Sequence, residues 1–317
     1  MRHRRPRRLL ALALATAPLL LGAQPAGADA APRYQEYVAL GDSWSADVTP
    51  VGIRTDQAPS GCAQSGWNYP RQVAKALKTV RFKDATCGAA TSAHLRTAQD
   101  VTYVPGLLDG VNEPQLKRVS KSTDLVTFGF GGNDIGLAGA ALGCFNLLPP
   151  LEPLAALKLP APLGKDCRSG WVRPDGTDLM TRRIAEAEPQ LVRAIEDVRG
   201  AAADDATVLV VDYLAGVPVD HGCYPSVQAH DGDLMWLGEK LKELNAMLRS
   251  AAKEAGAGFV DTYSGSVGHD VCQGPGARWV EGFVPLSSEP PFLAVPLHPN
   301  RLGADHQARS VLNTLRT

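Results

Sequence analysis

The sequence predicts an α/β fold in which a central parallel sheet carries helices on both faces. Two observations support this prediction. Short apolar runs rich in β-branched residues recur along the chain, and they alternate with segments whose apolar residues return every three to four positions. Such alternation is typical of parallel sheets. Ligands bind such sheets beyond the carboxyl ends of the strands, so residues that follow the strands are the first candidates for a site.

The expected elements follow in chain order. The first strand is expected at Val38–Leu40, where an apolar run stops at a glycine. A weaker run and three stronger ones predict further strands at 79–82, 124–130, 206–214 and 257–263. Helical spacing of apolar residues predicts helices at 67–77, 178–199 and 234–254. One more helix, opened by a proline, is expected just after His298.

Residues 143–176 cannot form regular structure, because the segment is rich in proline and also contains Gly164. Cys144 and Cys167 bracket it. We therefore expect a surface loop closed by a disulfide rather than a linker between domains. Residues 31–317 are expected to form one domain.

The first residues of the chain have the pattern of an export signal. The basic stretch MRHRRPRR precedes the apolar run LLALALATAPLLLGA, and Ala28-Asp29-Ala30 fits the small-residue rule for cleavage. The apolar run is too short to span a bilayer, and Pro18 interrupts it. Residues 1–30 are thus expected to be a signal peptide of the Sec or twin-arginine route, and the mature protein is expected to be secreted.

Without this leader the chain is mildly acidic. Loss of residues 1–30 removes five arginines and one aspartate, so the net charge changes from −1 to −5. This balance argues against a nucleic-acid groove and against a polybasic membrane anchor. No second apolar run is long enough for a membrane-spanning helix. We expect a monomer with no nucleic-acid partner and no integral membrane segment.

All the cysteines lie in the mature part of the chain, and an exported protein can form disulfides. Sequential pairing gives short loops with nothing threaded through them. A zinc site is the alternative, but the sequence has no C-x-x-C pair and no H-E-x-x-H motif. Disulfides are therefore favoured, and no metal is expected; the expected pairs are Cys62–Cys87, Cys144–Cys167 and Cys223–Cys272.

Ser43 follows the first strand, where a sheet of this class exposes a side chain. Its hydroxyl is a poor nucleophile until a base takes its proton. Taken alone, Ser43 is as compatible with a turn or a helix cap. Three further segments change this interpretation, because each follows an element expected to end at the same sheet edge: residues 86–95, residues 128–136 with Asn133, and residues 295–308 with His298.

Short motifs in these segments resemble those of a known enzyme family. Gly41-Asp42-Ser43, Gly131-Gly132-Asn133-Asp134 and His298-Pro299-Asn300 stand in the order and at the distances of the GDSL, or SGNH, hydrolase family. The chain looks like the secreted three-disulfide esterases and lipases of actinobacteria, over residues 34–317 and including the cysteine spacing. The resemblance implies a flavodoxin-like three-layer α/β/α sandwich. It also implies Ser43 as nucleophile, His298 as base and Asn133 as an oxyanion donor.

The sequence departs from the family pattern in the second motif. The family has Cys-Gly-Gly-Ala or Cys-Ser-Gly-Ala there, whereas this chain has Cys87-Gly88-Ala89-Ala90. The position of the oxyanion glycine is thus Ala89, with Gly88 one step before it. Because the donor is a backbone N–H, an alanine can serve if its backbone angles permit.

A second departure concerns the triad acid. The family commonly has an aspartate three residues before the histidine, and here that residue is Val295. Some secreted members use a main-chain carbonyl instead, and the resemblance implies this for Val295 or Pro296. A carbonyl can hold Nδ1–H and fix the tautomer of His298.

The sequence therefore predicts a secreted serine hydrolase of carboxylic esters that works through a Ser43–His298 dyad and an acyl-enzyme. The N–H groups of Ser43 and Ala89 and the side chain of Asn133 would hold the oxyanion. No metal or cofactor is needed. Acylglycerol, phospholipid, aryl or short-chain esters and acetylated sugars all stay open as substrates.

Two other classes remain as alternatives. An α/β-hydrolase proper is disfavoured, because no G-x-S-x-G elbow occurs and the serine comes first in the chain. A non-catalytic secreted binding module would keep the sheet and the disulfides. It would have no reason to hold Ser43, Asn133 and His298 together. Elsewhere, His306 is expected on a helix face, and His221 and His269 beside the third cysteine pair.

Overall fold

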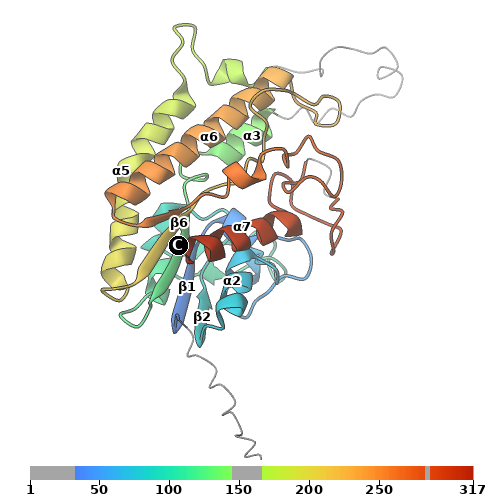
Figure 1. Cartoon of the computed structure of the whole chain (residues 1–317). Coiled ribbons are helices and arrows are strands. Elements are labelled where there is room, and N and C mark those ends of the chain that lie inside the picture. Colours follow the sequence, from blue (N-terminus) through green and yellow to red (C-terminus); the bar gives the residue numbers. More distant parts are fainter. Residues whose placement is uncertain (1–32, 145–165, 283–285, 317) are drawn as a thin grey trace, which may run out of the picture. The chain divides into compact units, whose positions relative to one another are not determined.

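The central sheet contains five parallel strands in the order β2-β1-β5-β6-β7 (Figure 1). This is the flavodoxin-like order, in which the second strand of the sheet lies outside the first. The computed structural model describes residues 33–144, 166–282 and 286–316. The strands of this sheet are β1 (Glu36–Gly41), β2 (Arg81–Asp84), β5 (Leu125–Gly129), β6 (Thr207–Val211) and β7 (Gly258–Val260).

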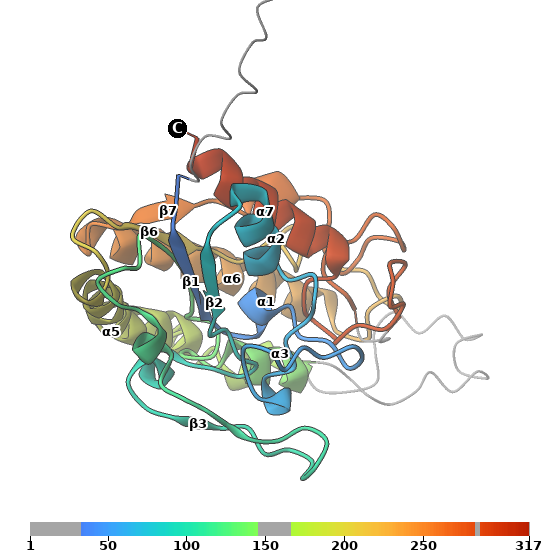
Figure 2. The ribbon, with the colours of Figure 1, turned by 90° about the horizontal axis from the view of Figure 1, so that it is seen from below.

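Helices cover both faces of the sheet, as the sequence predicts. They are α1 (Ser43–Ala46), α2 (Tyr69–Leu77), α3 (Leu137–Cys144), α5 (Leu179–Ala201), α6 (Asp231–Glu254) and α7 (Arg301–Thr314). Figure 2 shows α2 and α7 together on one side of the strands and α5 on the other. The fold is therefore a three-layer α/β/α sandwich.

The alternation of side chains along β1 explains the two helical layers. Tyr37 and Ala39 point into the cluster formed with α2 and α7, whereas Val38 and Leu40 point into the cluster formed with α5 and α6. All four are completely buried. A strand that is apolar on both faces requires cover on both faces, which is why the run at 38–40 predicts a buried parallel strand.

The expected positions of the strands are largely confirmed, with one shift. The strand expected at 79–82 lies at Arg81–Asp84, because the pairing of this edge strand with β1 begins at Arg81, opposite Glu36. Arg81 and Lys83 each bind the buried carboxylate of Glu36 on β1, at 2.7 and 2.9 Å. Burial raises the pKa of Glu36, but these hydrogen bonds outweigh it and the pKa falls to about 2.

Some structure was not expected from the sequence. A small antiparallel pair, β3 (Gln99–Asp100) with β4 (Val111–Asn112), closes an extended hairpin (Figure 2). Short 3₁₀ turns occur at Ser60–Cys62, Ser92–Leu95, Gln115–Arg118, Arg168–Gly170 and Ser264–Ser266. These turns and the two-residue strands are too short to leave a periodic pattern.

The proline-rich excursion expected at 143–176 lies mostly outside the described residues. Its first two residues complete α3, which ends at Cys144, and so are regular. After the gap, Cys167 leads into a 3₁₀ turn, and Asp178 caps α5. The helix expected after His298 is α7; its cap is Asn300, whose Oδ1 accepts from the N–H groups of Leu302 and Gly303, and not the proline before it.

All six cysteines are paired, and the pairing is the sequential one: Cys62–Cys87, Cys144–Cys167 and Cys223–Cys272. The described residues belong to one compact unit. Within the described residues, no helix combines the length and the apolarity needed to cross a bilayer.

Candidate active site

Ser43 stands at the carboxyl end of β1, in the one-turn helix α1. Asp42 caps this helix, and its Oδ1 accepts a hydrogen bond from the N–H of Trp44 at 2.9 Å. The turn needs a glycine before it, because a Cβ on Gly41 would lie 2.8 Å from the carbonyl oxygen of Gly129. The motif Gly41-Asp42-Ser43 therefore combines a close strand approach, a cap and the hydroxyl.

His298 reaches Ser43 from the other end of the chain. Its Nε2 lies 2.8 Å from Ser43 Oγ, and its Nδ1 lies 2.8 Å from the carbonyl oxygen of Pro296. A carbonyl can only accept, so the proton is on Nδ1 and the unprotonated Nε2 accepts from the serine hydroxyl. Of the two carbonyls expected from the sequence, that of Pro296 makes the contact.

The electrostatics of His298 follow from its burial. Desolvation lowers the pKa of His298 below its ordinary value, and the Pro296 carbonyl opposes this in part. A neutral imidazole is the form that can accept a proton. The lowered pKa of His298 therefore favours the neutral imidazole at neutral pH.

A backbone ladder holds the histidine turn in place. The N–H of Leu297 donates to the Glu281 carbonyl at 2.8 Å, and the N–H of Glu281 donates to the His298 carbonyl at 3.0 Å. The carboxylate of Glu281 in turn accepts from Asn300 Nδ2 at 2.8 Å. Asn300 thus holds both the turn that contains His298 and the start of α7.

Ala89 lies in the loop after β2 and adopts a left-handed backbone conformation with φ of 59°. This conformation costs an L-residue other than glycine roughly 1–2 kcal/mol. The neighbouring amides are engaged: Gly88 N–H donates to the Cys62 carbonyl at 3.1 Å, and Ala90 N–H donates to the Cys87 carbonyl at 3.2 Å. Of the two donors considered from the sequence, Ala89 is the one whose N–H has no protein acceptor among the described residues.

Asn133 ties the loop after β5 to the same region. Its Nδ2 donates to the Ala90 carbonyl at 2.9 Å, which uses one of the two amide hydrogens and leaves the other. The next residue, Asp134, accepts from the N–H and the hydroxyl of Ser92 at 3.0 and 2.5 Å. The motifs that contain Ser43, Ala89 and Asn133 thus converge on one edge of the sheet.

A network under Ser43 contains a residue that the sequence patterns did not single out. The hydroxyl of Tyr213 donates to Asp42 Oδ2 at 2.5 Å and accepts from the N–H of Gly132 at 2.8 Å. Burial raises the pKa of Asp42 to about 7, although the bond from Tyr213 opposes this. Tyr213 lies just beyond the end of β6, but the strand expected at 206–214 included it, so the rule that sites lie beyond strand ends did not point to it.

A cavity of about 280 Å³ opens beside Ser43 and His298. Its polar lining includes the catalytic candidates and Tyr213, and the remaining wall is mostly aliphatic. The aliphatic residues come from α3, α6 and the segment before His298, together with two from other loops: Leu137, Ala138, Ala141, Leu142, Leu237, Leu241, Val295, Leu297, Val217 and Val280. Such a wall can bind an apolar chain next to Ser43.

Three other histidines considered from the sequence lie away from this cavity. His306 is on α7, as expected, and its Nε2 contacts the Thr262 carbonyl at 2.9 Å. His269 stacks on Trp279 with ring centroids 3.7 Å apart. His221 lies close to Asp270 and Cys272, as its place beside the third bridge predicts. None of the three lines the cavity next to Ser43.

The sandwich fold, with a serine and a histidine in contact at the carboxyl edge of the sheet, is the arrangement that the sequence predicts for an ester hydrolase. Residues 39–306 match the GDSL-like Lipase/Acylhydrolase family. The chain belongs to this family and is a carboxylic ester hydrolase. Its three disulfides fit the secreted actinobacterial members that the motifs indicate.

Two curated relatives illustrate the likeness. The chain is 34% identical to Lipase 2 of Streptomyces coelicolor, over 97% of this chain and 96% of the relative. It is 29% identical to an esterase of Streptomyces scabiei, over 98% and 94%.

Two solved structures share the fold. The extracellular lipase of Streptomyces rimosus aligns with a TM-score of 0.58 and 24% identity, over 89% of this chain and 98% of that one. Phospholipase A1 of Streptomyces albidoflavus aligns with a TM-score of 0.58 and 20% identity, over 89% and 99%.

Proposed function

We propose that Ser43 is the nucleophile of this ester hydrolase and that His298 is its general base. The observation that carries the proposal is the contact of 2.8 Å between Ser43 Oγ and His298 Nε2, together with the 2.8 Å bond that fixes Nδ1 on Pro296. Nucleophile, base and orienting group stand in the order that activates a serine hydroxyl.

The reaction then runs in two halves. Ser43 Oγ attacks the acyl carbon while Nε2 takes its proton, and the tetrahedral intermediate collapses to an acyl-enzyme as the imidazolium protonates the leaving alkoxide. Water attacks the acyl-enzyme with His298 again as base, and the carboxylic acid leaves as the Ser43 hydroxyl is restored. The Pro296 carbonyl stabilises the imidazolium less than a carboxylate would.

Three donors would hold the oxyanion: the N–H of Ser43, the N–H of Ala89 and the second amide hydrogen of Asn133. The free N–H of Ala89 and the fixed amide of Asn133 support this assignment. Preorganised donors of this kind are worth roughly 10²–10³-fold each in serine hydrolases.

The aliphatic wall beside Ser43 favours, as substrates, esters whose acyl group has several carbons over acetyl esters. An apolar pocket gains free energy with each buried methylene, about 0.8 kcal/mol apiece. The names of the relatives, a lipase and an esterase, agree with an acyl-ester substrate. A panel of p-nitrophenyl esters of increasing acyl length should show kcat/KM rising from acetate; a maximum at acetate would contradict the acyl-chain assignment.

We also propose that the protein is exported, with residues 1–30 as its signal peptide. Three disulfides and the extracellular lipase among the structural neighbours support export. Sequencing the N-terminus of the protein from culture medium tests this, with a start close to Ala31 as the expected result.

A covalent serine probe tests the nucleophile. A fluorophosphonate should label the wild-type protein on the peptide that contains Ser43, and Ser43→Ala should abolish the labelling. Ser45→Ala is the matched control, because Ser45 is a buried serine of the same helix, and it should keep the label. Undiminished labelling of Ser43→Ala would overturn the assignment.

A further inference from the structure

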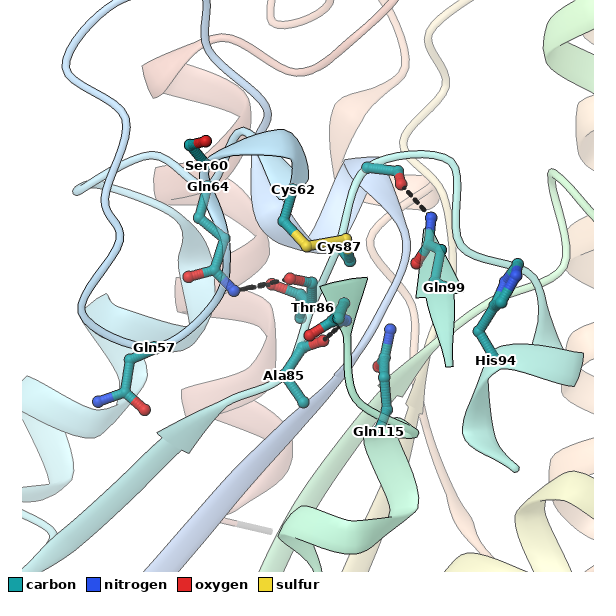
Figure 3. The surroundings of a disulfide bond; sticks show 12 residues. Gln57, Ser60, Cys62, Gln64, Ala85, Thr86, Cys87, His94, Gln99 and Gln115 are labelled. Atoms are coloured by element: carbon teal, nitrogen blue, oxygen red, sulfur yellow. Dashed lines mark hydrogen bonds between the residues drawn. A yellow bond between two sulfur atoms is a disulfide. The ribbon is translucent and has the colours of Figure 1, made fainter. Parts of the chain in front are cut away.

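We propose that Gln99 is a positioning residue of the oxyanion hole. Gln99 lies on β3, is 5% exposed, and donates from Nε2 to the Gly88 carbonyl at 2.7 Å. Figure 3 shows its amide beside the Cys62–Cys87 disulfide, directed at the loop that carries Cys87. The inference rests on the proposed role of the Ala89 N–H.

The carbonyl of Gly88 and the N–H of Ala89 belong to the same planar peptide unit. A hydrogen bond on one end of this unit therefore fixes the direction of the other end. It also polarises the unit, so the N–H becomes a better donor. Among the described residues, no protein group accepts from the Ala89 N–H, so the unit is free to serve a substrate oxygen.

The hydrogen bond from Gln99 to the Gly88 carbonyl matters more with alanine at position 89 than it would with glycine there. Ala89 has φ of 59°, a conformation that alanine disfavours. Rotation of the Gly88–Ala89 peptide would relieve the alanine and would turn a carbonyl oxygen to where the donor should be. The rotation would leave the buried Nε2 of Gln99 without an acceptor, since Gly88 supplies its hydrogen bond.

Gln64 provides a matched comparison, because it donates to another carbonyl of the same loop from outside it (Figure 3). It is fully buried, its Nε2 donates to the Thr86 carbonyl at 2.6 Å, and its Oε1, like that of Gln99, is buried without a partner. The peptide unit it braces ends in the N–H of Cys87, which donates to the Gly41 carbonyl inside the protein. Gln64 thus stabilises the loop, but the N–H of the peptide unit that it holds is already bonded within the protein and cannot bind a substrate oxygen.

The test compares Gln99→Leu with Gln64→Leu on p-nitrophenyl butyrate. Gln99→Leu should lower kcat by about 10- to 100-fold with KM within about twofold, because the oxyanion forms only in the transition state. Gln64→Leu should lose similar thermal stability but keep kcat within about threefold. Equal losses of kcat in both variants, or none in Gln99→Leu, would overturn the proposal.

A second-site variant separates positioning from a general structural role. Glycine adopts the left-handed conformation without strain, so adding Ala89→Gly to Gln99→Leu should recover about fivefold or more of the lost kcat. The same addition to Gln64→Leu should recover no activity. Failure of Ala89→Gly to recover any of the kcat lost in Gln99→Leu would contradict the peptide-rotation argument.

If Gln99→Leu does not fold, Gln99→Glu gives an independent measurement. A protonated glutamic acid can donate to the Gly88 carbonyl and a carboxylate cannot, and burial raises the pKa of such a group. The ratio of variant to wild-type kcat should therefore fall between about pH 5 and about pH 8. A flat ratio would contradict the proposal. Activity that survives Ser43→Ala would instead refute the proposed function itself.

Discussion

His298 shows how a backbone carbonyl can orient a histidine where the family commonly has an aspartate. Its ring is desolvated, which lowers its pKa, and the Pro296 carbonyl supplies direction but no full charge. The carbonyl selects the tautomer that leaves Nε2 free for Ser43. In the proposed mechanism, the lack of an anion would disfavour the imidazolium intermediate, whereas the lowered pKa would keep the base neutral over a wide range of pH.

The pH dependence of the rate should follow from this. Because the proposed base is neutral imidazole and burial lowers the pKa of His298, kcat/KM should rise through the ionisation of His298 below about 6.5 and stay high into the alkaline range. The profile with a stable short-chain ester measures this. An apparent pKa well above the ordinary histidine value would indicate a nearby carboxylate.

Carboxamide substitutions should have small effects on turnover. Asp261 and Asp270 bind backbone N–H groups, of Ser264 and Cys272, and neither contacts His298. Asp261→Asn, Asp270→Asn and Asp305→Asn should therefore each lower kcat by less than about 10²-fold, against the roughly 10⁴-fold typical of a lost triad acid. A folded variant among them without turnover would show that a distant carboxylate completes a triad.

For single residues, the sequence predicted which side chains form the candidate site better than it predicted their backbone conformations and contacts. Ser43, Asn133 and His298 stand in recognisable motifs, and the structure brings all three to one sheet edge. The left-handed backbone of Ala89 and the contact of Tyr213 with Asp42 were not predictable. Both depend on how loops from different strands meet, which no local pattern encodes.

Among the elements, those with long apolar patterns were predicted well and short ones were not. The helices α5 and α6 lie within a few residues of their expected ranges, because each turns an apolar stripe toward the sheet. By contrast, β2 was displaced, since its pairing depends on Glu36 in another strand. The hairpin of β3 and β4 was missed for a different reason, because strands of two residues are too short to leave a periodic pattern.

A substitution in the helix α7 tests whether the free energy of unfolding can be lowered without a change in kcat. Val311 is completely buried in the cluster with α2, on the opposite side of the sheet from α5 and α6. Val311→Ala should lower the free energy of unfolding by about 2 kcal/mol and leave kcat unchanged. Asn313→Ala, an exposed position of the same helix, should change it by less than about 0.5 kcal/mol.

Denaturant unfolding and kinetics on the same samples measure both quantities. A large loss of kcat in Val311→Ala would mean that α7 transmits its packing to the His298 turn through Asn300, which caps the helix and binds Glu281. The backbone ladder between Glu281 and His298 should prevent such a loss, because it holds the turn independently of the packing of α7.

Across the whole molecule, the sandwich and the disulfides support the site in different ways. The Cys62–Cys87 bridge lies in the loop that carries Ala89, whereas Cys223–Cys272 closes a longer segment with a separation of 49 residues. Both the fold class and the sequential pairing were predictable, because alternating elements and cysteine spacing are global patterns. How loops close over an apolar cavity was not, since that depends on side chains from several elements.

Reduction should therefore destabilise the molecule as a whole. Each bridge can contribute roughly 3 kcal/mol by restricting the unfolded chain. The native protein should have an intact mass lower by six hydrogens than the fully reduced form, and its melting temperature should fall when a reductant opens all three bridges. Six titratable thiols in the native exported protein would contradict this.

The cooperation of Ser43 and His298 is the central claim, and a double-mutant cycle measures it most directly. Ser43→Ala and His298→Ala should each lower kcat by roughly 10³-fold or more, and the double variant should lose little beyond either one, because the two residues act as a unit. All three variants should unfold at nearly the wild-type temperature. Independent losses that multiply in the double variant would show that the 2.8 Å contact between the two side chains is not the catalytic one.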